Sequence, residues 1–317
     1  MLMLWAFFPI LGQFFYTTGG YVENFLVDLS FPKKRAGALI IGRLPSFIVT
    51  MLLLFAVFGR VVFVLPLFNA LGLILAGSIN IFGSILYFKA LQAGDTADVN
   101  IFGQLSPLIS LGLGILILGE TVTLNQGIGL GLIMLAILVI VLGGFSKKER
   151  HAPNLKVAVL TIMATFFSIL SDVVFAYFIK GFTSDLTLLG QSLFFFEIGS
   201  ALTVIILIIC MTSWRRTVRT VFFTGKKHKK NFVALLADNI TFTLGELLYK
   251  YGLLVVPVVA MMTAVGKVAG LFVSFFYTFF LGRVFPNFIH GKRITHKIIV
   301  RYIVAAVLII SGIVVMT

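Results

Sequence analysis

The chain has 317 residues, of which 60% are hydrophobic and 11% are charged, and its mean hydropathy is +1.11. This composition excludes a soluble protein, because no soluble core could bury that much apolar surface, and it predicts a polytopic membrane protein. The net charge of +14 is what basic loops between membrane spans produce, so we expect no nucleic-acid partner. The single Cys210 excludes an internal disulfide.

Apolar stretches of about twenty residues or more recur along the chain and are long enough to cross a hydrocarbon layer of about 30 Å as helices. The polar residues within them do not alternate as they would in barrel strands, so the spans are predicted to be helical. The fold class that follows is an all-α polytopic membrane protein. We predict ten transmembrane helices, at 3–29, 36–58, 64–91, 98–119, 124–144, 155–180, 186–212, 231–252, 255–282 and 298–316.

Basic residues are divided unevenly between the two sides that alternating spans define. The breaks after odd-numbered spans contain most of them, among them Lys33 and Lys227, whereas the other side holds only Arg60, Lys180 and Lys250. Positively charged loops remain in the cytoplasm. We therefore predict a multi-pass protein of the cell (plasma or inner) membrane, with its basic loops in the cytoplasm and both termini outside.

Segments in the two halves of the chain look like copies of each other. LYFKAL at residues 86–91 matches LYKYGL at 248–253, and ILGE ending at Glu120 matches FLGR ending at Arg283. Five spans in each half is an odd number, so the copies must cross the membrane in opposite directions and form an inverted repeat. The predicted domains are two five-helix repeats, at 1–150 and 151–317.

Short motifs in the first half carry a family resemblance. They are Ala90 and Leu91 at the end of the third span, Pro107 in the fourth, Gly119 and Glu120 after it, and Gln126 and Gly127 at the start of the fifth. With ten spans in two halves, the chain resembles the EamA-type ten-helix permeases of the drug/metabolite transporter superfamily. The resemblance implies a transporter whose substrates include drugs, sugars or nucleotide-linked compounds.

The chain departs from that family in two ways. Arg283 stands where the second half of the family often carries another Glu. The charge bias also opposes the usual orientation, in which both termini lie inside. The two departures agree with each other, because Arg283 falls on the predicted cytoplasmic side and Glu120 on the outer side.

No constellation in the sequence indicates catalysis. The four histidines lie in polar breaks, and there is no zinc-protease, serine-nucleophile or phosphate-loop motif. We therefore predict that the protein is not an enzyme and has no catalytic residue, metal or cofactor. An integral-membrane enzyme stays an alternative, although the sequence contains no set of residues that would form a catalytic site.

Charged residues within the predicted spans mark the candidate site, because a charge at the bilayer centre costs roughly 3 kcal/mol or more unless it is paired or hydrated. Lys267 lies near the middle of the ninth span, and we expect it to pair with Glu246 or Glu197. The small residues of GKVAG, 266–270, should bring a neighbouring helix close to it.

A second group of charges is predicted nearer the cytoplasmic side. We expect Arg43 to pair with Glu23 or Asp238, either as a helix clamp or as a gate. Opposite charges at matched depth lower each other's cost of burial.

The predicted function is that of a secondary transporter that moves a small polar or amphoteric, amino-acid-like metabolite by alternating access. Lys267 would attract its carboxylate, and acidic side chains would bind its amine or a coupling proton. The predicted substrate-binding residues are Lys267, Glu246, Tyr249, Gln104, Asn100, Tyr87, Asn80, Glu197 and Asp172.

We expect charges from the second half of the chain and neutral hydrogen bonds from the first. Membrane lipid is another expected partner. The protein is expected to be a monomer or a homodimer, and in a homodimer the partner would be a second copy of the chain. The alternative function is a non-transporting membrane scaffold or lipid-handling subunit, in which the charges only clamp helices together.

Overall fold

The computed structural model of the protein describes residues 4–29, 36–93, 99, 102–143, 155–180, 186–223, 228–256, 258–284 and 296–316. These residues form helices and no strand, which confirms the all-α prediction. In chain order the helices are α1 (Leu4–Leu29), α2 (Ala36–Phe58), the 3-10 helix η1 (Gly59–Phe63), α3 (Leu67–Ala93), α5 (Ser106–Leu118), α6 (Leu124–Gly143), α7 (Leu155–Ile179), α8 (Leu186–Cys210), α9 (Thr212–Phe223), α10 (His228–Val255), α11 (Val259–Val284) and α12 (His296–Met316).

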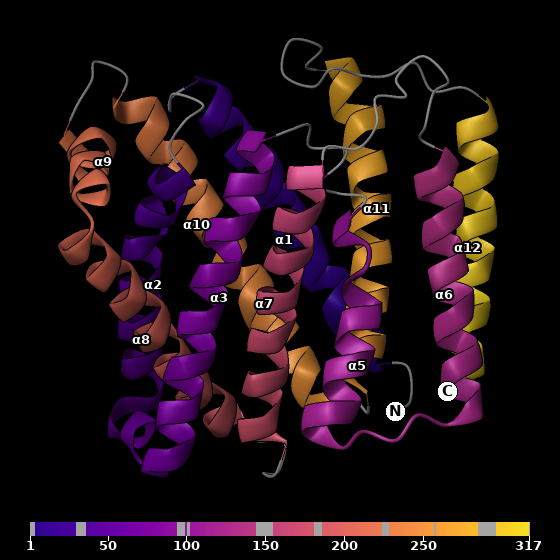
Figure 1. Cartoon of the computed structure of the whole chain (residues 1–317), viewed down its shortest axis with the longest axis horizontal. Helices are drawn as coiled ribbons and strands as arrows, with labels where there is room; N and C mark the ends of the chain where they lie inside the picture. Colours follow the sequence, from indigo (N-terminus) through magenta and orange to yellow (C-terminus); the bar gives the residue numbers. More distant parts are fainter. Residues whose placement is uncertain are drawn as a thin grey trace.

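The long helices stand side by side in one bundle and alternate in direction (Figure 1). Five segments among the described residues are long and apolar enough to cross a membrane: Ile40–Phe63, Leu67–Ala93, Leu155–Ile179, Leu186–Cys210 and Val259–Tyr277. α10 is less apolar because it carries Asp238, Glu246 and Lys250. The protein is a membrane protein with several spans, and the full count of ten stays a prediction.

α1 begins and α12 ends at the same end of the bundle (Figure 1). The predicted placement of both termini outside stays a prediction. Which end faces the cytoplasm stays a prediction.

Two predicted breaks differ from the structure. The stretch that begins at Trp214 was expected to be a polar loop, yet Thr212–Phe223 forms α9. Its Trp214 and Val218 pack against the cluster of buried side chains that α2, α3 and α8 share, while Arg215 and Arg216 are exposed. The break predicted directly after residue 252 lies later in the chain, because α10 continues to Val255 and α11 begins at Val259.

The helices of the two halves pack in equivalent ways. If α1, α3 and α5 of the first half are exchanged for α7, α10 and α11 of the second, the same pairs of helices remain in contact. α3 packs against α7 as α1 packs against α10, and α5 packs against α7 as α11 packs against α1. α6 and α12, the last helices of the halves, pack against each other. This exchange supports the predicted inverted repeat, which stays a prediction.

Glycines allow the closest of these helix contacts. A Cβ atom on Gly77 of α3 would collide with the carbonyl oxygen of Phe196 on α8, and one on Gly199 of α8 would collide with that of Ile74 on α3. Where α1 crosses α10, a Cβ on Gly12 would lie 3.2 Å from the Gly245 carbonyl oxygen. Such contacts between small residues hold transmembrane helices together without a hydrophobic driving force.

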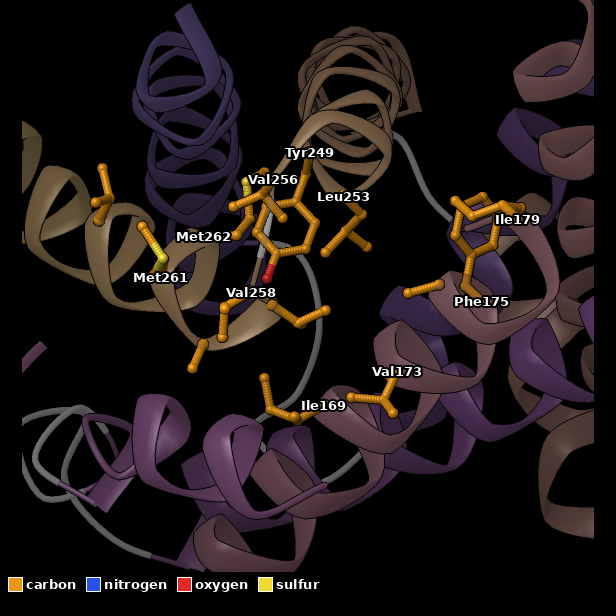
Figure 2. Packing of buried hydrophobic residues seen from close by; sticks show 14 of the residues in the cluster. Ile169, Val173, Phe175, Ile179, Tyr249, Leu253, Val256, Val258, Met261 and Met262 are labelled. Atoms are coloured by element: carbon orange, nitrogen blue, oxygen red, sulfur yellow. The ribbon is translucent and has the colours of Figure 1, made fainter. Parts of the chain in front are cut away.

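Buried apolar side chains of α7, α10 and the start of α11 pack against one another. Figure 2 shows Tyr249 and Leu253 of α10 beside Val258 and Met262, with Val173 of α7 facing them. All five are buried in the largest apolar cluster of the described residues. This packing positions the polar side chains that the same three helices carry.

Candidate functional site

A stripe of four residues along α10 organises the charged interior. Asp238, Phe242, Glu246 and Lys250 follow one another at intervals of four, so they lie on one side of the helix over about 18 Å of its length. The three charged members are 1%, 5% and 1% exposed, in chain order. Buried charges of this kind need partners from neighbouring helices.

Lys250 is the centre of a buried ion-pair cluster. Its Nζ atom donates to Oδ1 of Asp172 on α7 at 2.7 Å, and it lies 3.5 Å from Oε1 of Glu246, one turn earlier on α10. Two carboxyl groups thus share one ammonium group that is shielded from the surroundings.

Two aromatic rings complete the surroundings of Lys250. The Nζ atom lies 4.6 Å from the centre of the Phe175 ring on α7 and 4.3 Å from that of Phe196 on α8. The two rings meet edge to face with their centres 5.6 Å apart. The face of a ring attracts a desolvated cation by about 2 kcal/mol. Helices α7, α8 and α10 therefore enclose a single ammonium group.

The first half of the chain contributes hydroxyl groups. The Tyr16 hydroxyl of α1 donates to Oε2 of Glu246 at 2.5 Å. On the same helix as Glu246, the Tyr249 hydroxyl lies 3.5 Å from Oγ1 of Thr263, which donates to Oγ of Ser110 on α5 at 3.2 Å. At this cluster the charges come from the second half and the neutral groups from both.

Lys250, rather than Lys267, is the cation that pairs with Glu246. The prediction that Lys267 pairs with Glu246 or Glu197 is wrong, because Lys267 forms no ion pair with any described residue. Lys250 was counted among the basic residues of the outer side, at the end of the eighth span, but it is buried within α10. The spacing of four between Glu246 and Lys250 was the signal that could have identified the pair.

Lys267 is half-buried on α11, where this helix packs against α1. A Cβ atom on Gly270 would lie 2.9 Å from the Gln13 side chain of α1, and one on Gly266 would lie 3.8 Å from its Oε1. The close helix contact predicted from GKVAG is thus confirmed. Asp172 lies within electrostatic reach of Lys267.

Glu197 lies on α8, directly after Phe196, and is 4% exposed. Its Oε2 atom has no hydrogen-bond partner among the described residues. It interacts electrostatically with both Glu246 and Lys250. A buried carboxyl oxygen without a donor is costly, so this position favours a proton or a donor group of a ligand.

Arg43 and Asp238 form a second buried pair further along α10. The Arg43 Nε atom lies 3.7 Å from Oδ2 of Asp238, and the guanidinium carbon lies 3.9 Å from the centre of the Phe242 ring. The predicted pairing of Arg43 with Asp238 is therefore confirmed. The alternative partner Glu23 has a side chain outside the described part of the structure.

The other predicted site residues are dispersed. Gln104 precedes α5, and its Oε1 atom is buried without a partner in the described structure. Asn80 lines a narrow recess together with Arg43. Tyr87 is 36% exposed, unlike its repeat counterpart Tyr249, and Asn100 lies outside the described residues. Within the described ranges, no three His, Cys, Asp or Glu side chains are grouped to hold a metal ion.

A third ion pair joins three helices at the end of the bundle where the chain termini lie. Glu120, just after α5, pairs with Lys180, just after α7. The same carboxylate accepts the backbone N–H of Val259, the first residue of α11, with distances of 3.1 and 3.2 Å to its two oxygens. A negative charge at a helix N-terminus is favourable. Neither Glu120 nor Lys180 was among the predicted site residues.

Residues 3–142 match the model of the EamA-like transporter family. The matched residues lie within the first of the two predicted repeats. The resemblance stated from the sequence motifs is confirmed for this part of the chain. None of the curated proteins matches the chain.

The fold extends over both halves. A solved structure titled "Crystal structure of protein" is similar with a TM-score of 0.69, covering 100% of this chain and 97% of its own, at 13% sequence identity. At that identity the similarity shows the fold alone.

Within the residues that match the family model, the Gly119–Glu120 motif has a structural explanation. Gly119 ends α5 in the left-handed conformation, with φ of 64°, and a Cβ on Gly114 would collide with the Glu120 carboxylate. These glycines let Glu120 fold back toward α11. Thr123 and Gln126 exchange hydrogen bonds of 3.0 and 3.3 Å at the start of α6, which is a capping box.

Proposed function

We propose that the protein is a secondary carrier that moves a small amphoteric metabolite, with an amine and a carboxylate, by alternating access. The observation that carries the proposal is the buried cluster of Asp172, Glu246 and Lys250 inside the apolar bundle. Ionisable groups within a membrane are rare and mark paths for substrates or ions. Helix packing alone could be achieved with small and apolar residues, as it is at Gly77 and Gly199.

The two ends of such a metabolite fit different groups. Asp172 and Glu246 offer carboxylates to its amine. Lys267 offers an ammonium group that forms no ion pair with a described residue, so it is suited to the metabolite's carboxylate. Glu197, with its unpartnered Oε2 atom, is suited to carry a coupling proton.

Two ion pairs are placed to act as gates on either side of this cluster. Arg43 and Asp238 lie toward the end of the bundle at which α2 and α10 begin, and Glu120 and Lys180 lie at the opposite end (Figure 1). In alternating access each gate would open in turn while the other stays closed. In this proposal a gate is closed when its ion pair is formed, as both pairs are in this structure.

A lipid-handling subunit is the second candidate function. It is favoured by an apolar recess of about 230 Å³ between α11 and α12, lined by Phe272, Phe275, Tyr302, Ile303 and Ala306. A lipid tail would fit such a lining, whereas a polar metabolite would not.

A thermal-shift screen of the purified protein at two pH values separates these functions. The classes to compare are amino acids, sugars, cationic amines without a carboxylate, and lysolipids. We expect amphoteric compounds to raise the melting temperature of the wild type but not that of Asp172→Asn. Stabilisation by lysolipids alone, equal in both proteins, would support the lipid-handling function and exclude the carrier of amphoteric metabolites.

A further inference from the structure

The surroundings of Lys250 have the composition of a receptor for an alkylammonium ion. Asp172 and Glu246 supply two carboxylates, and Phe175 and Phe196 present two rings within 4.6 Å of the Nζ atom. Acidic groups combined with aromatic faces are how proteins recognise organic cations.

This site keeps its form through contacts that do not involve Lys250. Glu246 is held by the Tyr16 hydroxyl, and the Phe175 and Phe196 rings support each other edge to face. Glu197 adds a third carboxyl group within electrostatic reach. The walls belong to α1, α7, α8 and α10, so the receptor is preorganised without its lysine.

The two members of the central ion pair are buried to different degrees. The Lys250 side chain is 1% exposed, whereas that of its partner Asp172 is 16% exposed. Asp172 is therefore the member of the pair that an incoming amine would meet first.

We propose that Lys250 is a tethered occupant of an alkylammonium-binding site, and that the amine of the transported metabolite displaces it. The second clause rests on the proposed function, whereas the binding site itself does not. Exchange of one ammonium group for another keeps the charge of the cluster constant, so the buried carboxylates are never left without a cation. Without substrate, Lys250 keeps the cluster neutralised and the helices together.

Chemical rescue of Lys250→Ala tests the site. The substitution removes a propylammonium group, so free n-propylammonium is the matching probe. We expect it to raise the melting temperature of Lys250→Ala saturably, by at least about 3 °C, because a ligand stabilises the state that binds it. Wild-type protein, whose site is occupied, should show no such rise.

Three controls make the result specific. Sodium chloride at equal concentration and n-propanol, which lacks the charge, should not stabilise Lys250→Ala. Propylammonium should not stabilise Lys267→Ala, which removes the same group from a position without an ion pair. It should also fail with Asp172→Asn/Lys250→Ala, in which one carboxylate is lost. Equal stabilisation of all variants, or none of Lys250→Ala, would overturn the proposal.

A variant that does not fold alone still gives an answer. Lys250→Ala can be purified with and without propylammonium throughout, and recovery of folded protein only in its presence supports the site. No recovery in either condition, with normal recovery of Lys267→Ala, contradicts a preorganised receptor. Rescue without transport of any amphoteric metabolite would refute the proposed function only, and transport without rescue would refute the tethered-occupant site only.

Discussion

Lys250 and Lys267 lie on consecutive apolar helices but differ in their partners. Lys250 is paired with two carboxylates, whereas Lys267 forms no ion pair with a described residue. Lys250→Met leaves Asp172 and Glu246 buried without their cation, and breaking a buried ion pair costs about 3–5 kcal/mol. Lys267→Met removes an ammonium that has no ion pair, so we expect no loss of stability. Chemical unfolding in detergent micelles measures both. Equal destabilisation by the two substitutions would contradict the assigned ion pairs.

An ion pair could be predicted from the sequence only where the two charged residues lie at matching depths in the membrane along their predicted spans. Arg43 and Asp238 lie at matched positions along their spans, and the structure pairs them. Lys250 was instead counted among the basic residues of the outer side, because it lies close to the end of the predicted eighth span, although it is buried within α10. Lys267 was chosen by its depth alone, although depth does not reveal which helix face a residue occupies.

The glycines between α3 and α8 determine how closely these helices approach. Gly77→Val places side-chain atoms against the backbone of α8, and overpacking of this kind costs about 1–3 kcal/mol. Gly112→Ala of α5 is the matched control, because a Cβ there meets no atom within 4 Å and Ala favours a helix by about 0.5–1 kcal/mol. Thermal unfolding of both variants checks this contrast. A Gly77→Val protein as stable as the control would show that α3 and α8 pack differently.

Glu120 links the end of α5 to the start of α11 and the end of α7. Glu120→Gln should cost about 1–2 kcal/mol, because it removes the charge that Lys180 and the α11 N-terminus share. A double-mutant cycle with Lys180→Met isolates the pair, and we expect a coupling energy of about 0.5–3 kcal/mol. Strictly additive effects would mean that Glu120 and Lys180 do not interact in the membrane.

Helices were easier to predict than their ends and their partners. Long apolar runs identified the helices, because a helix is one of the few structures that satisfy all backbone hydrogen bonds in lipid. α9 was missed since Arg215, Arg216 and Arg219 resemble loop residues. Among the side chains of α9 that the structure describes, Trp214, Thr217 and Val218 are the ones that pack inward. The role of Glu120 depends on a contact with Val259, which is remote in the sequence and leaves no local pattern.

The orientation of the whole molecule is a prediction that labelling can test. With Cys210 replaced by Ser, single cysteines at Thr121 and Lys227 lie on opposite sides of the predicted topology. A membrane-impermeant maleimide applied to intact cells should label Thr121→Cys and not Lys227→Cys, because basic loops stay inside. The reverse result would place both termini in the cytoplasm, as is usual in the family that the first half resembles.

The central claim is that the cluster of Asp172, Glu246 and Lys250 binds the substrate of a carrier. Uptake of a labelled amphoteric metabolite, chosen by the thermal-shift screen, into proteoliposomes tests it most directly. We predict that Asp172→Asn reduces uptake at least about 100-fold, as expected when one charged contact to the substrate is lost. Arg60→Met, an exposed position of η1 outside the cluster and both proposed gates, should retain uptake within about tenfold. Unchanged uptake by folded Asp172→Asn protein would contradict the claim.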